Sequence, residues 1–288
     1  GLVSGSLDLD KIEYLKRDAR FCGVPYGEVD VDRLLYALVV LEDPETGRPE
    51  LGVQEKGVAA LESLLFSKYQ MFRNVYWHHA VRAATAMYKR IVADALDAGL
   101  VGPDELVGRT DEALLFALES KAREGVLRGG EPAEAAARIG QWLEMLRSRK
   151  LPKRAAEVVA AELDGESVGR WLIHDSPLKR RVEERLAQEL DLAPGGAFLD
   201  YPEKPAMFGL NLLVRRGSGA VIRLGPGGRA GLIGLPRVAD SLYRTARVLR
   251  LFTLGERRRV DPAAVARLAL LSESDVERRL ASSEPLLR

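Results

Sequence analysis

Chemically active side chains near the start of the sequence recur at helical spacing. They are Asp10, Lys11, Tyr14 and Asp18. Residues three and four apart share one face of a helix, so these four form a stripe, while Ile12, Leu15 and Ala19 face the other side and can enter a core. Two carboxylates, an ammonium and a phenol could together serve a metal, a phosphate and a sugar. The alternative is a solvated helix face laced with ion pairs.

Three sequence motifs resemble those of one family. Asp8 to Asp18 is similar to the last motif of the HD-domain deoxynucleoside-triphosphate triphosphohydrolases (dNTPases), Asp-x-Asp-Lys-x-(Asp/Glu)-Tyr followed by Leu-x-Arg-Asp. Lys68 to His78 resembles their Arg-Tyr-x-Met-x-x-x-Val-Tyr-x-His helix, with Lys in place of Arg. Arg149 to Lys153 is a weaker match. The resemblance covers residues 1 to 155 and implies metal-dependent hydrolysis of dNTPs to deoxynucleoside and inorganic triphosphate.

The resemblance implies a role for individual residues. Asp10 is expected to bind a divalent metal, which could be Mn, Mg, Fe, Ni or Zn, and Lys11 to neutralise phosphate oxygens. Asp18 would accept a hydrogen bond from the sugar 3′-hydroxyl, and the Tyr14 ring would occupy the space of a 2′-hydroxyl. Tyr14 could instead simply pack, and Asp18 could pair with a neighbouring cation. Lys68 is expected to contact the triphosphate, and Tyr76 is expected to border the base or sugar.

Some relatives bind a regulatory nucleotide between subunits. The residues at the corresponding positions here are Arg33, Lys56 and His79. The resemblance therefore implies a nucleotide activator and a homo-oligomer, either a dimer or a tetramer. A surface cation is usually just solvated, which is the alternative for these residues.

The family's other metal ligands are a His and then a His-Asp pair upstream of the late Asp. The histidines of this chain are His78, His79 and His174, all after Asp10. One carboxylate cannot hold a catalytic metal. We therefore expect this sequence to be the C-terminal portion of a longer enzyme, inactive by itself, with no catalytic residue visible in it. The dipeptide His174-Asp175 follows Asp10 instead of preceding it, so it is not expected to bind the metal.

Composition limits the alternatives. The chain has 288 residues, of which 47% are hydrophobic and 30% charged, as in a soluble globular protein. It contains no apolar run long enough to cross a membrane. The single Cys22 is typical of a reducing compartment, which favours the cytoplasm. The net charge of +1 gives no general attraction to nucleic acid, although seven Arg oppose two acidic residues between Pro236 and Val260.

The hydrophobic pattern predicts a mainly α protein: an HD-domain-like helical bundle with a small β-hairpin and a C-terminal α+β lobe. The expected domains are residues 1–193 and 194–288. Helices are predicted over residues 7–21, 56–76, 79–98, 110–124, 131–147, 153–163, 177–192 and 238–252. Strands are predicted over residues 31–41, 50–54, 210–215 and 220–224.

Two other functions stay open on the sequence alone. The same site could cleave another nucleotide phosphoester. The protein could also be a non-catalytic nucleotide sensor or bind nucleic acid through its Arg-rich stretch, in which case affinity should fall steeply with salt.

Overall fold

The structure is a computed structural model. It describes residues 7, 9–130, 132–163, 168–173, 176–203, 209–225 and 232–288, without the side chains of residues 236 and 237. The chain forms two compact units of interleaved segments. The first comprises residues 1–78, 159–165 and 202–248, and the second residues 79–158, 166–201 and 249–288. The boundary expected after residue 193 would divide the chain into two domains, each continuous in sequence. It remains a prediction.

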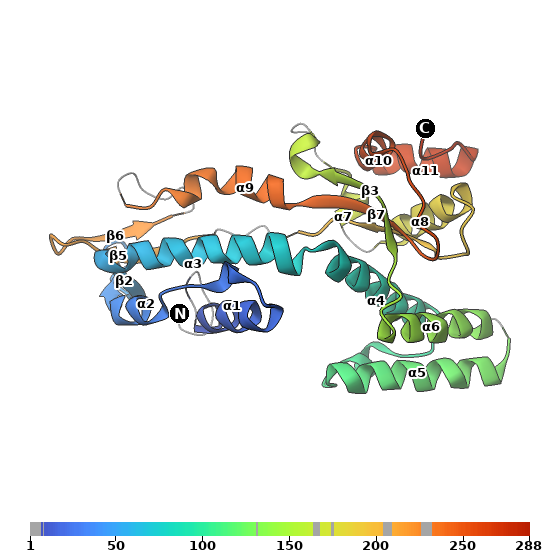
Figure 1. Ribbon diagram of the computed structural model, residues 1–288, viewed down its shortest axis with the longest axis horizontal. Coiled ribbons are helices and arrows are strands. Elements are labelled where there is room, and N and C mark those ends of the chain that lie inside the picture. The colour runs from blue at the N-terminus through green and yellow to red at the C-terminus, as the bar shows by residue number, and fades with distance from the viewer. Residues whose placement is uncertain are drawn as a thin grey trace. The chain divides into compact units, whose positions relative to one another are not determined.

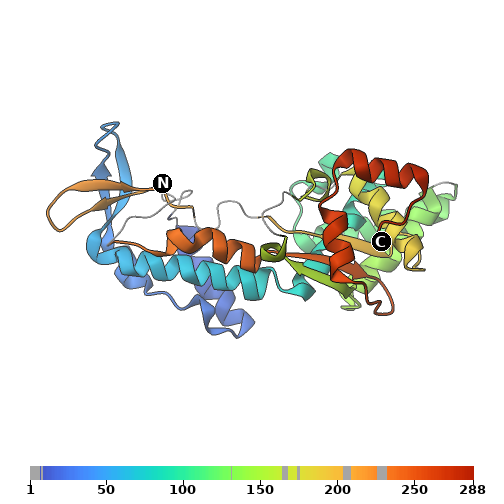
Figure 2. The same cartoon turned by 90° about the horizontal axis from the view of Figure 1, so that it is seen from above.

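The first unit combines helices with a small sheet (Figure 1). Its helices are α1 (Leu9–Cys22), α2 (Val31–Ala37), α3 (Val58–Met71) and α9 (Ala239–Ala246), with a π-helical turn at Phe72–Tyr76 and 3-10 turns at Pro25–Gly27, Glu55–Gly57, Ala160–Glu162 and Leu235–Val238. The strands are β1 (Leu38–Glu42), β2 (Pro49–Gln54), β5 (Leu212–Arg215) and β6 (Val221–Leu224), in the order β1-β2-β5-β6. Figure 2 shows the β1–β2 and β5–β6 hairpins beside the start of α3. The pair β2–β5 is parallel, and the other two pairs are antiparallel.

Helix α1 lies against the core of the first unit through its apolar stripe. Ile12, Leu15 and Ala19 are all buried, as the spacing predicted. The following turn approaches the helix closely at Gly27, where a Cβ atom would lie 2.4 Å from both the Ala19 Cβ and the Leu15 carbonyl oxygen. Only glycine fits there without moving backbone, so this contact fixes the position of α1 and of the polar residues on it.

The second unit surrounds a separate core. Its helices are α4 (His79–Asp97), α5 (Asp111–Arg128), α6 (Pro132–Arg147), α7 (Arg170–Ile173), α8 (Pro177–Glu189), α10 (Pro262–Ala269) and α11 (Glu273–Ser282), with a 3-10 turn at Pro103–Leu106. Its sheet has the order β3-β7-β4, from β3 (Lys153–Val159), β7 (Val248–Thr253) and β4 (Ala197–Asp200). Helices α4, α5 and α6 enclose a core that includes Ile91, Ile139, Trp142 and Phe198.

The predicted fold class is confirmed, with corrections to individual elements. Residues 31–37 are a helix and not a strand, because the Asp30 side chain caps the segment by accepting a hydrogen bond from the Arg33 amide at 3.0 Å. Residues 153–159 and 248–253 are strands, although helices were predicted there. Strand β7 is the middle strand of its sheet and is almost wholly buried, so apolar and polar residues do not alternate along it as they do in a half-buried strand. None of the described helices is long and apolar enough to cross a membrane.

Candidate functional site

The structure brings together three of the residues singled out in the sequence. Tyr14 and Asp18 lie one turn apart on α1, and Tyr76 ends the π-helical turn after α3. The Tyr76 hydroxyl donates a hydrogen bond to Asp18 Oδ2 at 2.8 Å. The rings of Tyr14 and Tyr76 meet edge to face, with centroids 6.3 Å apart and planes at 64°. Two distant motifs therefore form one polar, aromatic cluster, which we call the tyrosine–aspartate cluster.

The π-helical turn carries Tyr76 into this cluster. The Trp77 amide donates to the Phe72 carbonyl at 2.8 Å, a bond that spans five residues instead of four. Phe72 also packs edge-on against Tyr76, with ring centroids 5.0 Å apart. A π turn rotates the residues after it out of the regular 3.6-residue period, and such turns recur at functional sites. The α-helical period assumed from the sequence therefore does not continue from Lys68 to Tyr76.

The surroundings of Tyr76 keep its hydroxyl protonated. Burial raises the pKa of Tyr76 far above its usual value of 10.0, and the hydrogen bond to the Asp18 carboxylate raises it further. Asp18 remains about one-third exposed, and its Oδ1 lies 3.6 Å from Arg17 Nε. Asp18 is thus an oriented carboxylate with an exposed portion, a group that can accept a hydrogen bond from a ligand hydroxyl.

The other predicted substrate and metal residues have different surroundings. Asp10 is exposed in the first turn of α1, Lys11 beside it is partly buried, and Lys68 is only 5% exposed on α3. Within the described part of the chain, no three His, Cys, Asp or Glu side chains gather closely enough to hold a metal ion. These residues therefore do not form a complete divalent-metal site. Asp8 and the dipeptide His174-Asp175 lie outside the described residues.

Two of the three residues expected at a regulatory site are neighbours. Arg33 Nε donates to the Lys56 carbonyl oxygen at 3.3 Å, and both residues are exposed on the first unit. The same turn is tied to the β5–β6 hairpin, since Glu55 Oε2 accepts from the Gly217 amide at 2.7 Å. His79 begins α4 and belongs to the second unit.

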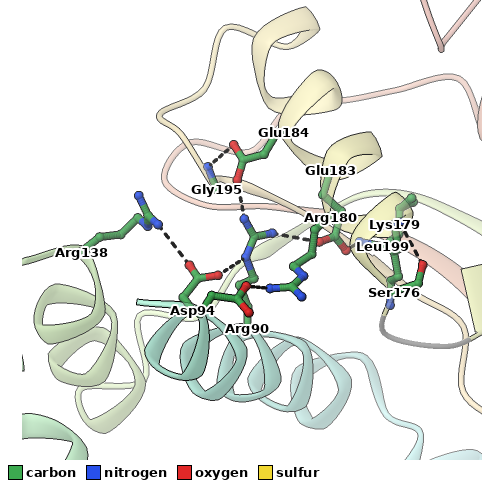
Figure 3. A network of polar contacts seen from close by, with 11 residues as sticks. Arg90, Asp94, Arg138, Ser176, Lys179, Arg180, Glu183, Glu184, Gly195 and Leu199 are labelled. Atoms are coloured by element: carbon green, nitrogen blue, oxygen red, sulfur yellow. Dashed lines mark hydrogen bonds and ion pairs between the residues drawn. The ribbon is translucent and has the colours of Figure 1, made fainter. Parts of the chain in front are cut away.

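A buried ionic network in the second unit was not predicted (Figure 3). Arg90 of α4 donates to Asp94 Oδ1 at 2.8 Å and to Glu183 Oε2 of α8 at 3.0 Å, and it also binds Glu184. Asp94 accepts a further bond from Arg138 Nη2 at 3.2 Å. Burial lowers the Arg90 pKa, but the surrounding carboxylates outweigh it and the net pKa is raised. A sequence signal existed: Arg90 and Asp94 lie four residues apart beside the apolar Ile91.

Two members of the Arg-rich stretch are used inside their own units. Arg247 Nε donates to the Pro202 carbonyl oxygen at 2.7 Å in the first unit. Arg250 is buried in the second unit, where its Nε donates to Glu157 Oε1 at 2.8 Å. Both guanidinium groups already have acceptors, so this stretch offers less free positive charge than its composition indicates.

Comparison with known proteins gives a family and a fold. A family model described as HD associated region matches residues 29–226. The chain is 35% identical over 114 residues to an uncharacterized protein of Methanocaldococcus jannaschii, an alignment that covers 40% of this chain and 25% of the relative. It is also 35% identical over 91 residues to the uncharacterized protein YwfO of Bacillus subtilis, covering 32% and 20%. The matched segments thus span a quarter or less of these relatives.

A solved structure supports the same fold. The crystal structure of a phosphohydrolase from Bacteroides thetaiotaomicron matches with a TM-score of 0.55 and 16% sequence identity. The match covers 88% of this chain and 63% of that protein. At this identity the likeness concerns the fold, which is HD-like and mainly helical.

Proposed function

Because this chain belongs to the HD associated region family, we propose that it is part of an HD-type phosphohydrolase that converts dNTPs to deoxynucleoside and inorganic triphosphate. The observation that carries the proposal is the hydrogen bond from Tyr76 to Asp18, with the Tyr14 ring beside it. The phosphohydrolase fold of the structural neighbour supports the reaction class. The dNTP specificity rests on the motif residues.

The tyrosine–aspartate cluster would recognise the deoxyribose. Asp18 is held at one oxygen by Tyr76, so its carboxylate is oriented before a ligand arrives. We assign it the sugar 3′-hydroxyl as hydrogen-bond donor. The Tyr14 ring would fill the space that a 2′-hydroxyl needs. A ribonucleotide would then lose affinity both through the clash and through displacement of a paired polar group.

Lys11 and Lys68 would neutralise the triphosphate. An ammonium group acts as a point charge, without the two-pronged geometry of arginine, so Lys68 would attract phosphate oxygens without fixing one orientation. Asp10 remains the proposed ligand of a divalent metal. Such a metal needs several ligands, and the described residues do not complete the set. The remaining ligands would have to lie outside the described residues.

We also propose a nucleotide-activator site at Arg33 and Lys56. The hydrogen bond from Arg33 of α2 to the Lys56 carbonyl oxygen of the Glu55–Gly57 turn makes two exposed cationic residues neighbours on the first unit. A triphosphate bound there, with His79 contributed by a neighbouring copy, would link regulation to assembly of a homo-oligomer. Arg33→Ala should then abolish activation by added nucleotide and leave substrate binding intact.

Nucleotide binding tests the sugar-recognition step apart from turnover. In a chelating buffer, isothermal titration calorimetry would compare dATP with ATP. We expect dATP to bind at least about 10-fold more tightly, which corresponds to about 1.4 kcal/mol. The exposed Tyr36 is on the same unit, so Tyr36→Ala is the matched control and should leave this ratio unchanged. Equal affinities of the wild-type protein for dATP and ATP would contradict the proposal.

A further inference from the structure

Strand β1 lies at one edge of the sheet in the first unit, in a hairpin with β2 (Figure 2). Among the described strands it pairs with β2 alone. Its sequence is Leu-Val-Val-Leu-Glu, and the central Val40 is 69% exposed. Edge strands are usually shielded by lysine, proline or a bulge, because their free backbone groups pair readily with another chain. Residues 38–42 contain no lysine or proline, and they pair with β2 without a bulge.

The other edge strands of the two sheets differ from β1. Strand β6 includes Arg223, and β3 begins with Lys153 and Arg154. Charged side chains on an edge disfavour pairing with a second chain, because removing them from water costs free energy. Strand β4 is buried along its whole length. Among the described edge strands, β1 therefore offers an exposed edge with an apolar centre.

The hairpin turn determines which backbone groups of β1 point outward. The Asp43 amide donates to the Arg48 carbonyl oxygen at 2.9 Å, so this pair is hydrogen-bonded. Hydrogen-bonded and non-hydrogen-bonded pairs alternate along an antiparallel ladder. In the register of β1 and β2, the N–H and C=O groups of Leu38, Val40 and Glu42 therefore point away from β2.

We propose that β1 pairs with β1 of a second copy of this chain, antiparallel and centred on Val40, so that the two sheets become one. In this register Val40 of each copy donates to and accepts from Val40 of the other. The Glu42 amide of each copy donates to the Leu38 carbonyl oxygen of the other. The Leu38 amide takes no part, since it already donates to the Leu35 carbonyl oxygen at the end of α2.

The side chains and charges of β1 fit a second copy of itself. Val40 lies opposite Val40, and Val39 lies opposite Leu41 of the other copy, so apolar residues pack across the junction. Glu42 is the charged residue of the strand. The two Glu42 side chains lie at opposite ends of the paired strands, about 14 Å apart at a rise of about 3.4 Å per residue, which exceeds the screening length of about 8 Å. A parallel pairing in register would instead place them side by side.

The test is analytical ultracentrifugation of the full chain over a range of concentrations, where we expect a reversible monomer–dimer equilibrium. Val40→Lys opposes two ammonium groups at the centre of the junction and should weaken dimerisation at least about 10-fold. Val40→Thr keeps a β-branched side chain and should retain the dimer. Val107 of the second unit is 78% exposed, so Val107→Lys is the matched control and should dimerise as the wild-type protein does. Circular dichroism would verify that both lysine variants are folded.

Spin labels test the register directly. The Cα atoms of a hydrogen-bonded antiparallel pair lie about 5.5 Å apart, so nitroxide labels on Val40→Cys should show strong dipolar broadening. Cys22→Ser removes the exposed native thiol, and labels on Val107→Cys in the same background should show no broadening.

Three results would overturn the proposal: a chain that stays monomeric, a dimer that persists in Val40→Lys, or a dimer without broadening at position 40. The first would leave the edge open to a strand of a different protein. The inference rests on the proposed function only in taking a second copy as the partner. Because the test measures association and not turnover, its failure is distinguishable from failure of the proposed dNTP reaction.

Discussion

The Tyr76 hydroxyl and the Asp18 carboxylate form a 2.8 Å hydrogen bond between residues 58 positions apart in the sequence. It joins the π-helical turn to the helix that carries Tyr14. Because Tyr76 is also in ring contact with Tyr14, a change at any of the three residues should affect the other two.

Removal of the Tyr76 hydroxyl should mainly affect substrate binding. Tyr76→Phe keeps the ring contacts but leaves Asp18 without this donor. We expect a stability loss of about 0.5–1.5 kcal/mol by urea unfolding and, in the full-length protein, a raised KM for dNTPs with a smaller change in kcat. Tyr36→Phe, at an exposed position, is the control and should change neither quantity. A fall in kcat at unchanged KM would argue against a role in holding the sugar.

The raised pKa of Tyr76 predicts a dependence of stability on alkaline pH. Burial is the main cause of the shift, so the folded protein holds this proton more tightly than the unfolded chain, in which the pKa is 10.0. The stabilisation is fully present below about pH 10 and is lost as the pH rises above it. The free energy of unfolding should therefore fall more steeply between pH 9.5 and about 11 in wild type than in Tyr76→Phe. Parallel curves for the two proteins would show that Tyr76 ionises normally.

Tyr14 should determine the preference for deoxynucleotides. Tyr14→Ala opens the space of a 2′-hydroxyl, so we expect the ratio of kcat/KM for dATP over ATP to fall at least about 10-fold. The measurement is competitive turnover of the two nucleotides by the full-length protein. Tyr14→Phe retains the ring and should keep the preference. An unchanged ratio in Tyr14→Ala would mean that the ring only packs against Tyr76.

The Arg90 network should contribute to the stability of the second unit. Arg90→Met leaves the buried Asp94 and Glu183 carboxylates without their main partner and should cost about 3–5 kcal/mol, measured by urea unfolding. The exposed pair Arg128–Glu124 provides the comparison: Arg128→Met should change stability by less than about 0.5 kcal/mol. Similar losses in the two variants would mean that the network is exposed to solvent.

Local signals in the sequence predicted some elements well and others poorly. The prediction of an apolar stripe on α1 was correct, because a helix buried on one side has apolar residues at a clear helical period. Leu15 on this stripe is fully buried. Strand β7 was mistaken for a helix because a strand buried on both faces lacks the alternation of apolar and polar residues that identifies a strand. Helix α2 was missed because Val31 and Tyr36 favour strands, whereas one capping contact from Asp30 starts a helix.

The residues of the candidate site could be predicted only where they belong to a sequence motif. Asp18 and Tyr76 each belong to a recognisable motif, but their contact arises from folding and from a π turn that spacing does not indicate. The contact between Arg90 and Glu183 spans 93 positions and belongs to no motif, so nothing in the local pattern pointed to it. The roles assigned to Asp10, Lys11 and Lys68 stay predictions.

Product analysis would test the proposed hydrolysis of dNTPs to deoxynucleoside and triphosphate. The full-length protein would be incubated with Mn²⁺ or Mg²⁺ and all four dNTPs, and the products separated by ion-exchange chromatography. We expect deoxynucleoside and intact inorganic triphosphate in equal amounts, with both products lost in the Asp10→Ala variant. Release of orthophosphate or pyrophosphate, or no turnover of any dNTP, would contradict it.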